Sequence, residues 1–448
     1  MAVTLKRRRF LPRHSGLALL WASILIAGAA LPAVAEQLSL EQAVQLALER
    51  NERALAAGEQ LRAAQGLVAQ ARAYFFPAVS VTGNFTRRPN AVKPELNGQV
   101  VTIQSQNAVS AYASLSWILF NPSVIPGYRQ ALLEERVQRY SSAETRRRLS
   151  FEVASAFLTT LTMDQVHVAA GHRLDYAGKT LEAARARYAA GLVSVNDVTR
   201  AELEYATAEM GSTQTQGEVQ TAYLQLGYLL DAAIDGKLAQ PELLLAQAEL
   251  PASEADTLLA GAGERRLDLR SLSWHAKAQR ALVLESSLEW LPSLTLTYQY
   301  RYTNEAGLTG KSTTWSAGLG LSWPIFDGFG RNGAYKEAKA RARLAELDLR
   351  GATRQVDLEV RGGLVSLASQ QASLKKAQVA LDAARKNAAE IAELYRQGLS
   401  NALQVADANV SLFEAEVELA RQRNGLALAL LNLRAAQGLD PFGKEPIS

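Results

Sequence analysis

The sequence contains no cysteine, and it has only four histidines and three methionines in 448 residues. Without cysteine the chain has no disulfide, no thiolate metal ligand, no cysteine nucleophile and no N-terminal cysteine that could carry a lipid. Two of the histidines, His167 and His172, lie five positions apart, whereas a spacing of four would place two ligands side by side on a helix. We therefore expect neither a metal site nor a cofactor.

Long apolar runs are confined to the N-terminus. Lys6, Arg7, Arg8, Arg9 and Arg13 precede an apolar run over 17–32, and Ala-Val-Ala follows at 33–35. This pattern predicts a secretory signal peptide over 1–35, with an A-x-A cleavage site. After it, no apolar run reaches 18 residues, which predicts no transmembrane helix, so any contact with a membrane interior would be made by strands.

The signal peptide also explains the basic charge. Removing its five cations from the 48 Lys and Arg leaves 43, against 44 Asp and Glu, so the rest of the chain is close to neutral. The basic isoelectric point therefore does not indicate a nucleic-acid partner.

Recognised catalytic patterns are missing as well. The sequence has no G-x-S-x-G, H-E-x-x-H or P-loop motif. A literal G-x-G-x-x-G occurs at 328–333, but it follows an alternating segment and no returning parallel strand comes after it, so it lacks the context of a dinucleotide site. We interpret these glycines as a bend between strand and helix, and we predict that the protein is not an enzyme.

The chain contains two copies of one unit. Five residues near one helix break have counterparts 207 positions later: Tyr188, Gly191, Leu192, Val198 and Ala201 match Tyr395, Gly398, Leu399, Val405 and Ala408. We predict a first repeat over 36–240, a connector over 241–252, a second repeat over 253–440 and a tail over 441–448. Each repeat is expected to contain a helix, two strands and a long helical hairpin with a tip, near 191–194 and near 398–401.

Four segments alternate with the period of a β-strand, at about 76–86, 109–120, 292–302 and 314–326. Their length suits a tilted crossing of a bilayer, and aromatic residues near their ends suit an interfacial girdle: Trp117, Tyr298, Tyr300, Trp315 and Trp323. Alternation alone leaves a soluble sandwich with one wet face equally open. Four strands are too few to close a barrel, and lipid does not tolerate unpaired strand edges, so we expect other copies of the chain to complete an oligomeric barrel around a polar lumen.

The chain has no proline over 127–240 or over 325–440, and helices of about 65 residues, or roughly 100 Å each, are predicted at about 123–190 and 332–397. Shorter helices are expected over 39–73, beginning with a capping box at Ser39, and over 253–289. Long, alanine-rich helices favour coiled-coil-like packing over a compact core.

The tips have two interpretations. In one, Gly191 and Gly398 are left-handed helix ends, and Ser194 with Asp197 and Asn401 with Gln404 are capping boxes for the returning helices. In the other, the tips form a mouth and a docking surface, because Leu192, Val193 and Leu399 have no obvious core to enter. The sequence leaves both open.

Four stretches together resemble the TolC-like outer-membrane efflux proteins: LSLEQAVQLALERN, RYAAGLVSVNDVTRAE, SWPIFDGFGR and LYRQGLSNALQVADA. The resemblance covers nearly all of the chain after the signal peptide. It implies a mixed fold, all-α plus β-barrel, in which a homotrimer forms a twelve-stranded outer-membrane β-barrel, four strands per chain, continued by a long periplasmic α-helical barrel. It also implies a passive exit duct of a tripartite efflux or type I secretion system in a Gram-negative bacterium, with a periplasmic adaptor protein and an inner-membrane transporter as partners. It does not identify the cargo.

The resemblance also implies site residues. Asp407 matches an acid that lines the periplasmic entrance, Gln404 stands where a second acid often occurs, and Asp197 and Tyr395 match positions that hold the entrance closed. Ser400 stands where an arginine partner can occur. The docking tips would comprise Gly191, Leu192, Val193, Ser194, Gly398, Leu399 and Ser400.

Arg200 is the first-repeat counterpart of Asp407, and we hypothesise a bond between them in the closed state, which predicts that Arg200→Ala raises leak conductance. A soluble periplasmic coiled-coil adaptor is the alternative function. It would also have helical hairpins, but it would not explain the four alternating strands.

Overall fold

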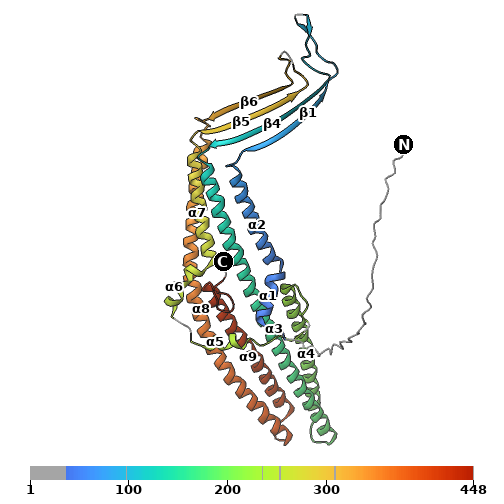
Figure 1. Cartoon of the computed structure of the whole chain (residues 1–448). Helices are drawn as coiled ribbons and strands as arrows, with labels where there is room; N and C mark the ends of the chain where they lie inside the picture. The colour runs from blue at the N-terminus through green and yellow to red at the C-terminus, as the bar shows by residue number, and fades with distance from the viewer. Residues whose placement is uncertain (1–36, 97, 235, 252–253, 307–308, 447–448) are drawn as a thin grey trace, which may run out of the picture.

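The computed structural model describes residues 37–446, apart from 97, 235, 252–253 and 307–308. The predicted signal peptide therefore lies outside the described residues. A small sheet occupies one end of the molecule, and helices run from it to two hairpin tips at the other end (Figure 1). The predicted combination of a strand region with long helices is confirmed.

Each half of the chain runs from helices through strands to a long helical hairpin, but the first half also contains the short strands β2 and β3, and the second half also contains the short helix α5. The first half contains α1 (Leu40–Arg50), α2 (Glu52–Ala73), β1 (Ala78–Arg87), β2 (Glu95–Leu96), β3 (Gln99–Val100), β4 (Asn107–Phe120), α3 (Val124–Ala189) and α4 (Val195–Leu230). The second half contains α5 (Glu242–Glu249), α6 (Ala255–Arg265), α7 (Leu267–Leu288), β5 (Ser293–Thr303), β6 (Thr313–Ser322), α8 (Gly330–Arg396) and α9 (Ala402–Ala436).

The predicted helices over 39–73 and 253–289 are each broken into two, α1 with α2 and α6 with α7. Asn51 separates α1 from α2 and is buried; its side chain accepts from the Arg53 N–H at 3.0 Å and donates to the Leu229 carbonyl at 3.0 Å. An Asn side chain that bonds to nearby backbone favours a helix start over a helix interior. Arg266, also buried and extended, separates α6 from α7, although its side chain does not cap α7.

The four long strands form one antiparallel sheet in the order β1-β4-β5-β6. Its register places the alternating residues consistently. Val79, Leu115, Tyr298 and Ala317 form one row across the sheet, and Ser80, Ser114, Gln299 and Ser316 form the next. One face is therefore apolar and the other polar, and the apolar face is open in the chain, with Leu319 67% exposed.

Among the described residues, strands β1 and β6 each pair on one side only, so both edges of the sheet are unpaired there. β6 ends at Ser322, earlier than the predicted strand over 314–326. Pro324 explains the early end, because proline has no N–H to donate to a strand ladder.

The two long helices, α3 with 66 residues and α8 with 67, run the length of the helical region. Near the sheet they lie beside α2 and α7, and toward the tips they form hairpins with α4 and α9 (Figure 1). Much of the packing uses alanine; Val166 and Ala169 of α3, for example, contact Val417 and Ala420 of α9. Among the helices of the described residues, none is both long and apolar enough to cross a membrane.

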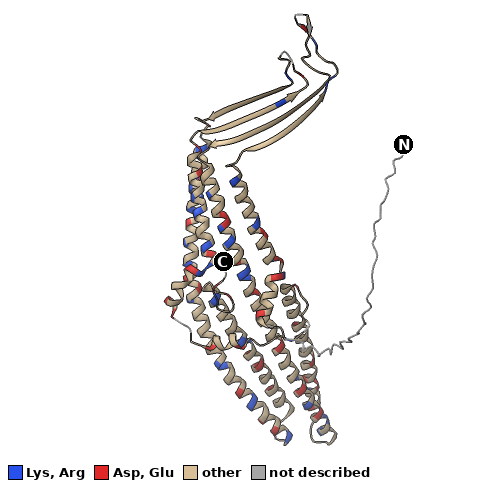
Figure 2. Cartoon of the chain, in the orientation of Figure 1, with Lys and Arg blue, Asp and Glu red and all other residues tan. Residues whose placement is uncertain are grey.

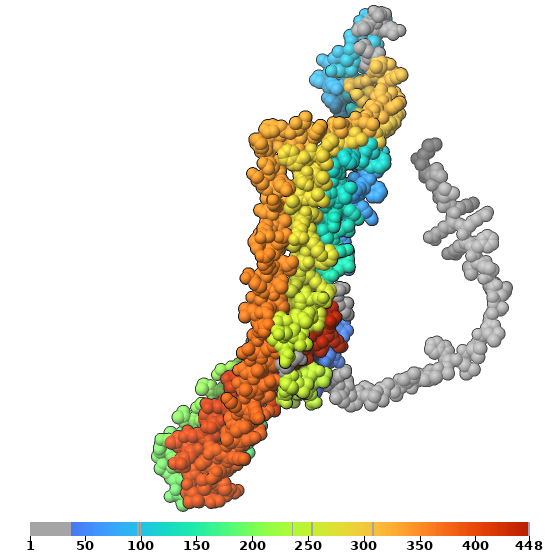
Figure 3. Space-filling view, turned by 90° about the vertical axis from the view of Figure 1, so that its left-hand side faces the viewer, coloured from blue at the N-terminus to red at the C-terminus, as the bar shows by residue number. Residues whose placement is uncertain are grey.

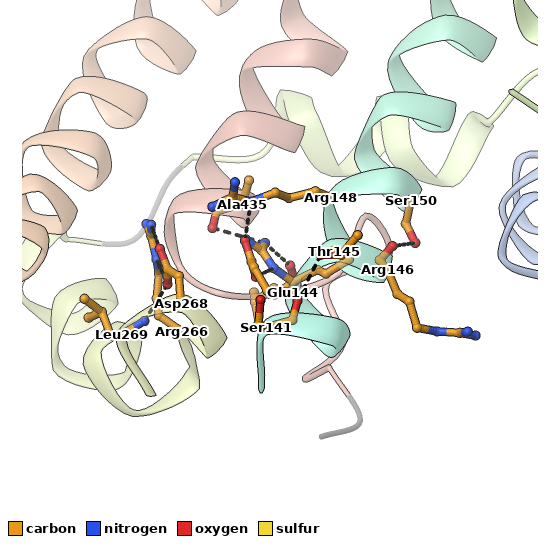
Figure 4. A network of polar contacts seen from close by, with 12 residues as sticks. Ser141, Glu144, Thr145, Arg146, Arg148, Ser150, Arg266, Asp268, Leu269 and Ala435 are labelled. Carbon is orange, nitrogen blue, oxygen red and sulfur yellow. Dashed lines mark hydrogen bonds and ion pairs between the residues drawn. The ribbon is translucent and has the colours of Figure 1, made fainter. Parts of the chain in front are cut away.

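Two buried arginines, one on α3 and one between α6 and α7, donate to backbone carbonyls around the end of α9 (Figure 4). Arg147 of α3 pairs with Glu144 at 2.7 and 2.9 Å and donates to the carbonyls of Ala435 and Leu439 at 3.3 and 3.0 Å. Arg266 pairs with Asp268 and donates to the Ala436 carbonyl at 3.2 Å. The last carbonyls of a helix lack partners within it, so these bonds fix the C-terminus of α9 between α3 and α7.

Candidate functional site

The two tips end their first helix with the same backbone motif. At the end of α3, Gly191 has φ +71°, its N–H donates to the Tyr188 carbonyl, and the Leu192 N–H donates to the Arg187 carbonyl. At the end of α8, Gly398 has φ +81°, and the N–H groups of Gly398 and Leu399 donate to the carbonyls of Tyr395 and Leu394. Both are Schellman motifs, in which a left-handed residue satisfies the last carbonyls of a helix. The predicted left-handed glycines are confirmed.

The returning helices start with capping boxes, as predicted. Asp197 accepts from the Ser194 N–H at 3.3 Å and from its hydroxyl at 3.2 Å. At the second tip, the Gln404 N–H donates to the Asn401 side chain at 3.0 Å, and the Gln404 side chain accepts from the Asn401 N–H and from the Ser400 hydroxyl. The side chains of Asp197, Gln404 and Ser400 are therefore engaged in the local turns, which fix the shape of the tips.

The tips also expose apolar side chains. Leu192 is 74% exposed and Leu399 is 73% exposed, so each tip presents one leucine to its surroundings. Val193, which the sequence led us to expect as exposed, is only half-exposed, and Val195 is exposed in its place.

Tyr395 joins the two hairpins just above the tips. Its side chain is buried in a cluster with Ala402 and Val405, against Ala183 of the other hairpin. The Arg187 guanidinium lies 4.1 Å from the ring centroid and also donates to the Tyr395 carbonyl. Burial raises the pKa of the Tyr395 hydroxyl, and among the described residues this hydroxyl has no hydrogen-bond partner.

Arg187 was missed by the sequence analysis. The corresponding residue of the second repeat, 207 positions later, is Leu394. The replacement of that leucine by an arginine at position 187 is the feature of the sequence that could have indicated a special role for Arg187.

Asp407 and Arg200 are both exposed, and no ion pair joins them within the described part of the chain. The backbone carbonyl of Asp407 accepts from the Ser411 hydroxyl at 2.9 Å, while no bond is formed by its carboxylate among the described residues. The hypothesised Arg200–Asp407 bond is therefore not formed between the described residues of one chain, and for the closed assembly it stays a hypothesis. Asp407 remains an uncompensated charge one to two turns from the second tip.

The aromatic residues expected at the sheet ends fall into two groups. Near the helices, the indole N–H of Trp117 donates to the Phe75 carbonyl at 3.2 Å, and that of Trp323 donates to the Trp290 carbonyl at 3.1 Å. Toward the loops, Tyr300 pairs in register with Trp315, and Tyr298, near the middle of β5, stacks on Trp315 with ring centroids 6.3 Å apart.

The glycine-rich segment at 328–333 forms a bend, as interpreted from the sequence. Gly328 has φ +68°, and the Asp327 carboxylate accepts from the Arg331 N–H at 2.9 Å and from its Nε at 3.0 Å. An acid of the chain itself thus occupies the helix start where a phosphate would bind in a dinucleotide site. Within the described residues, no three His, Asp or Glu side chains gather as metal ligands would.

A two-faced sheet joined to paired hairpins with matching tips is a distinctive arrangement. A family model described as outer membrane efflux protein matches residues 43–232 and 258–439. The chain belongs to this family. Outer membrane efflux proteins are transport conduits and not enzymes, which confirms the predicted class and decides against the soluble adaptor.

Relatives of this efflux protein match it over most of its length. Nodulation protein T of Rhizobium leguminosarum bv. trifolii is 24% identical over 86% of this chain and 82% of its own. The outer membrane protein TolC of Vibrio cholerae is 23% identical over 88% of this chain and 89% of its own.

Solved structures establish the efflux-protein fold. VceC from Vibrio cholerae aligns with a TM-score of 0.74 at 20% identity, covering 90% of this chain and 96% of its own. The Campylobacter jejuni CmeC outer membrane channel aligns with a TM-score of 0.76 at 17% identity, covering 91% of this chain and 87% of its own.

Proposed function

We propose that three copies of this efflux protein assemble into one exit duct, with the sheets closing a twelve-stranded barrel in the outer membrane of a Gram-negative bacterium. In this arrangement the helices extend into the periplasm, and the segment 1–35 is removed as a signal peptide. The single observation that carries the proposal is the open sheet, which has one apolar face, one polar face and two unpaired edges.

The sheet is unsuited to lipid as a single copy. Each unsatisfied backbone group in the hydrocarbon core costs several kcal/mol, and β1 and β6 each carry a row of such groups. Pairing β1 of one chain with β6 of the next satisfies both rows at once. The same closure turns the apolar residues toward lipid and the serine and threonine face toward a water-filled lumen.

The tips form the opposite end of the duct. Leu192 and Leu399 give each chain two exposed apolar contacts, so three chains present six around one entrance. We assign these leucines, with the turns that hold them, to docking with a periplasmic adaptor protein that links the duct to an inner-membrane transporter. Asp407 is assigned to the entrance, and Asp197 and Tyr395 to holding it closed, with Asp197 acting through the turn that it caps.

Cross-linking tests the assembly directly, because the chain has no native cysteine to interfere. A variant carrying Thr82→Cys in β1 and Gly318→Cys in β6 is treated with a short bifunctional maleimide in outer-membrane fractions. We expect a ladder that ends at three chains. The matched control places both cysteines on paired central strands, Ser114→Cys and Gln299→Cys, and should cross-link only within one chain.

Two results would contradict the proposal. The first is a cross-linked product that stays monomeric or continues beyond three chains. The second is recovery of the unmodified protein from the soluble periplasmic fraction without heat-modifiable migration on a gel.

A further inference from the structure

A basic groove lies between α3 and α7 on the half of the helical region nearest the sheet. It encloses a cavity of about 710 Å³, and its lining includes Arg129, Arg136, Lys277 and Arg280 together with Trp274. No Asp or Glu lines this cavity. Lys and Arg are also frequent along the neighbouring turns of α7 and α8 (Figure 2).

Trp274 holds two of these cations close together. The guanidinium of Arg136 lies 4.6 Å from the centroid of the Trp274 ring, and the ammonium group of Lys277 lies 3.8 Å from it. Aromatic faces attract cations, but two like charges on one ring still repel each other.

Carboxylates compensate the groove only at its edge. Arg280 pairs with Glu346 at 2.7 Å, while Arg129, Arg136 and Lys277 form no ion pair among the described residues. The groove thus has a net positive charge that a bound anion would neutralise.

The opposite face of the same helix pair is acidic. A cavity of about 730 Å³ between α2, α3 and α7 is lined by Glu134, Glu135 and Glu285 and by no Lys or Arg. The layer formed by α3, α7 and α8 side by side (Figure 3) therefore separates a basic groove from an acidic one. Such a separation has a consequence only if the two faces of the layer meet different surroundings.

The sheet indicates which face is which. Ile118 lines the acidic cavity, and it follows Ser114 and Ser116 on the polar face of β4. The acidic cavity thus continues the side of the polar sheet face, which faces the lumen in the proposed duct. The basic groove then belongs to the outer side, continuous with the lipid-facing side of the sheet.

The groove begins close to the end of the helices that adjoins the sheet. Arg129 is five residues into α3, or roughly 8 Å along the helix, and Lys277 lies eleven residues from the end of α7, or roughly 17 Å. Leu132 is 38% exposed and Leu284 is 48% exposed beside these cations. Cations next to exposed apolar side chains suit a ligand with a charged head and a hydrocarbon part.

We propose that this groove binds the phosphate headgroup of an anionic phospholipid in the periplasmic leaflet of the outer membrane. The headgroup lies between Arg136 and Lys277, Arg129 contacts it from the membrane side, and Leu132 and Leu284 contact the upper part of the acyl chains. The inference rests on the proposed function, because it requires this end of the helices to lie at a membrane surface.

Titration of the purified, detergent-solubilised full-length protein with fluorescent phosphatidylglycerol and fluorescent phosphatidylcholine tests the site. We expect tighter binding of phosphatidylglycerol, and an affinity reduced about fivefold for each cation removed in Arg136→Gln/Lys277→Gln. The control Lys375→Gln/Lys376→Gln removes two exposed cations from the tip-ward half of α8 and should leave affinity unchanged. If the double variant fails to fold, the single change Arg129→Gln should still lower affinity about fivefold.

Three results would overturn the inference. Equal affinity for the two lipids, or an unchanged affinity in the groove variants, would show that the groove does not select an anionic headgroup. Displacement of phosphatidylglycerol by inorganic phosphate at a similar concentration would assign the site to a soluble anion. Conductance of the same variants in planar bilayers separates the two proposals. If the protein forms conducting channels but does not bind phosphatidylglycerol selectively, only the lipid site is refuted. If it forms no channels, the proposed exit duct is refuted.

Discussion

Arg187 lies on the last turn of α3 with its guanidinium 4.1 Å from the ring of Tyr395, which lies on the last turn of α8. The same guanidinium donates to the Tyr395 carbonyl, so one side chain bonds to both the ring and the backbone of the other hairpin. This pair joins the two hairpins close to their tips. We expect this contact to oppose separation of the two tips of one chain.

Arg187→Leu is expected to open the entrance. Leucine is the residue at the corresponding position of the second tip, Leu394, so the substitution suits a helix of this type. A cation–π contact and a charge-assisted hydrogen bond together contribute about 2 kcal/mol, which corresponds to roughly a thirtyfold change in the ratio of open to closed channels. Open probability in planar bilayers measures this ratio.

Arg185→Leu serves as the control for that experiment. It removes the same charge two residues away, where Arg185 forms only an exposed ion pair with Glu202, and such pairs contribute little. Equal open probabilities for Arg187→Leu and the unmodified channel would refute the role of the Arg187–Tyr395 contact.

The tips illustrate what the sequence could predict. Capping boxes and left-handed glycines depend on residues three to five positions apart, so Asp197, Gln404, Gly191 and Gly398 could be placed from the sequence. The two faces of the sheet could be predicted for the same reason, because alternation within a strand determines them.

Contacts between distant segments could not be predicted in this way. Arg187 and Tyr395 are 208 positions apart, and nothing in their local sequences pairs them. The helix break at Asn51 likewise depends on a buried bond to the Leu229 carbonyl, 178 positions away. Without that partner the local pattern favours one continuous helix, as the sequence analysis expected.

Asp407→Asn is expected to lower the preference of the channel for cations. In the proposed trimer, three exposed carboxylates at one entrance attract cations, and together they contribute about 1 kcal/mol in a watery pore, so the cation-to-anion permeability ratio should fall roughly fivefold. Reversal potentials across a salt gradient measure the ratio. No ion pair joins Arg200 to Asp407 in the described chain, so Asp407→Asn should lower the permeability ratio equally in the unmodified channel and in Arg200→Ala. If Asp407→Asn has no effect in Arg200→Ala, the two residues are bonded between chains.

Gly398→Ala is expected to loosen the second tip. Alanine at φ +81° is strained by about 1 kcal/mol, although the space around Gly398 is open. Amide hydrogen exchange of residues 394–402 should therefore become faster. Gly211→Ala is a control with the opposite expected sign. Gly211 lies in open space within the helix α4, where alanine is favoured over glycine by up to about 1 kcal/mol, so amide exchange of the surrounding turns of α4 should slow. Slower exchange in both variants would mean that the left-handed turn does not constrain the tip.

Asp268→Asn is expected to destabilise the junction around the end of α9 in a pH-dependent way. Burial opposes ionisation of Asp268, but the hydrogen bonds and the positive charge of Arg266 outweigh it and hold the pKa of this carboxyl below its ordinary value of 3.8. A lowered pKa contributes stability that is present above the ordinary value and is lost as the pH falls through the folded-state value. At neutral pH the variant should therefore lose up to about 3 kcal/mol of folding stability, because Arg266 keeps a buried charge with one partner fewer.

Thermal unfolding of the detergent-solubilised protein should show a lower midpoint for the variant than for the unmodified protein at pH about 7. This difference in midpoint should shrink below pH about 4. Asp256→Asn, which removes an exposed partner of Arg361, should leave the midpoint unchanged at both pH values. A difference between Asp268→Asn and the unmodified protein that stays constant with pH would show that side-chain shape, and not the ionised pair with Arg266, stabilises this junction.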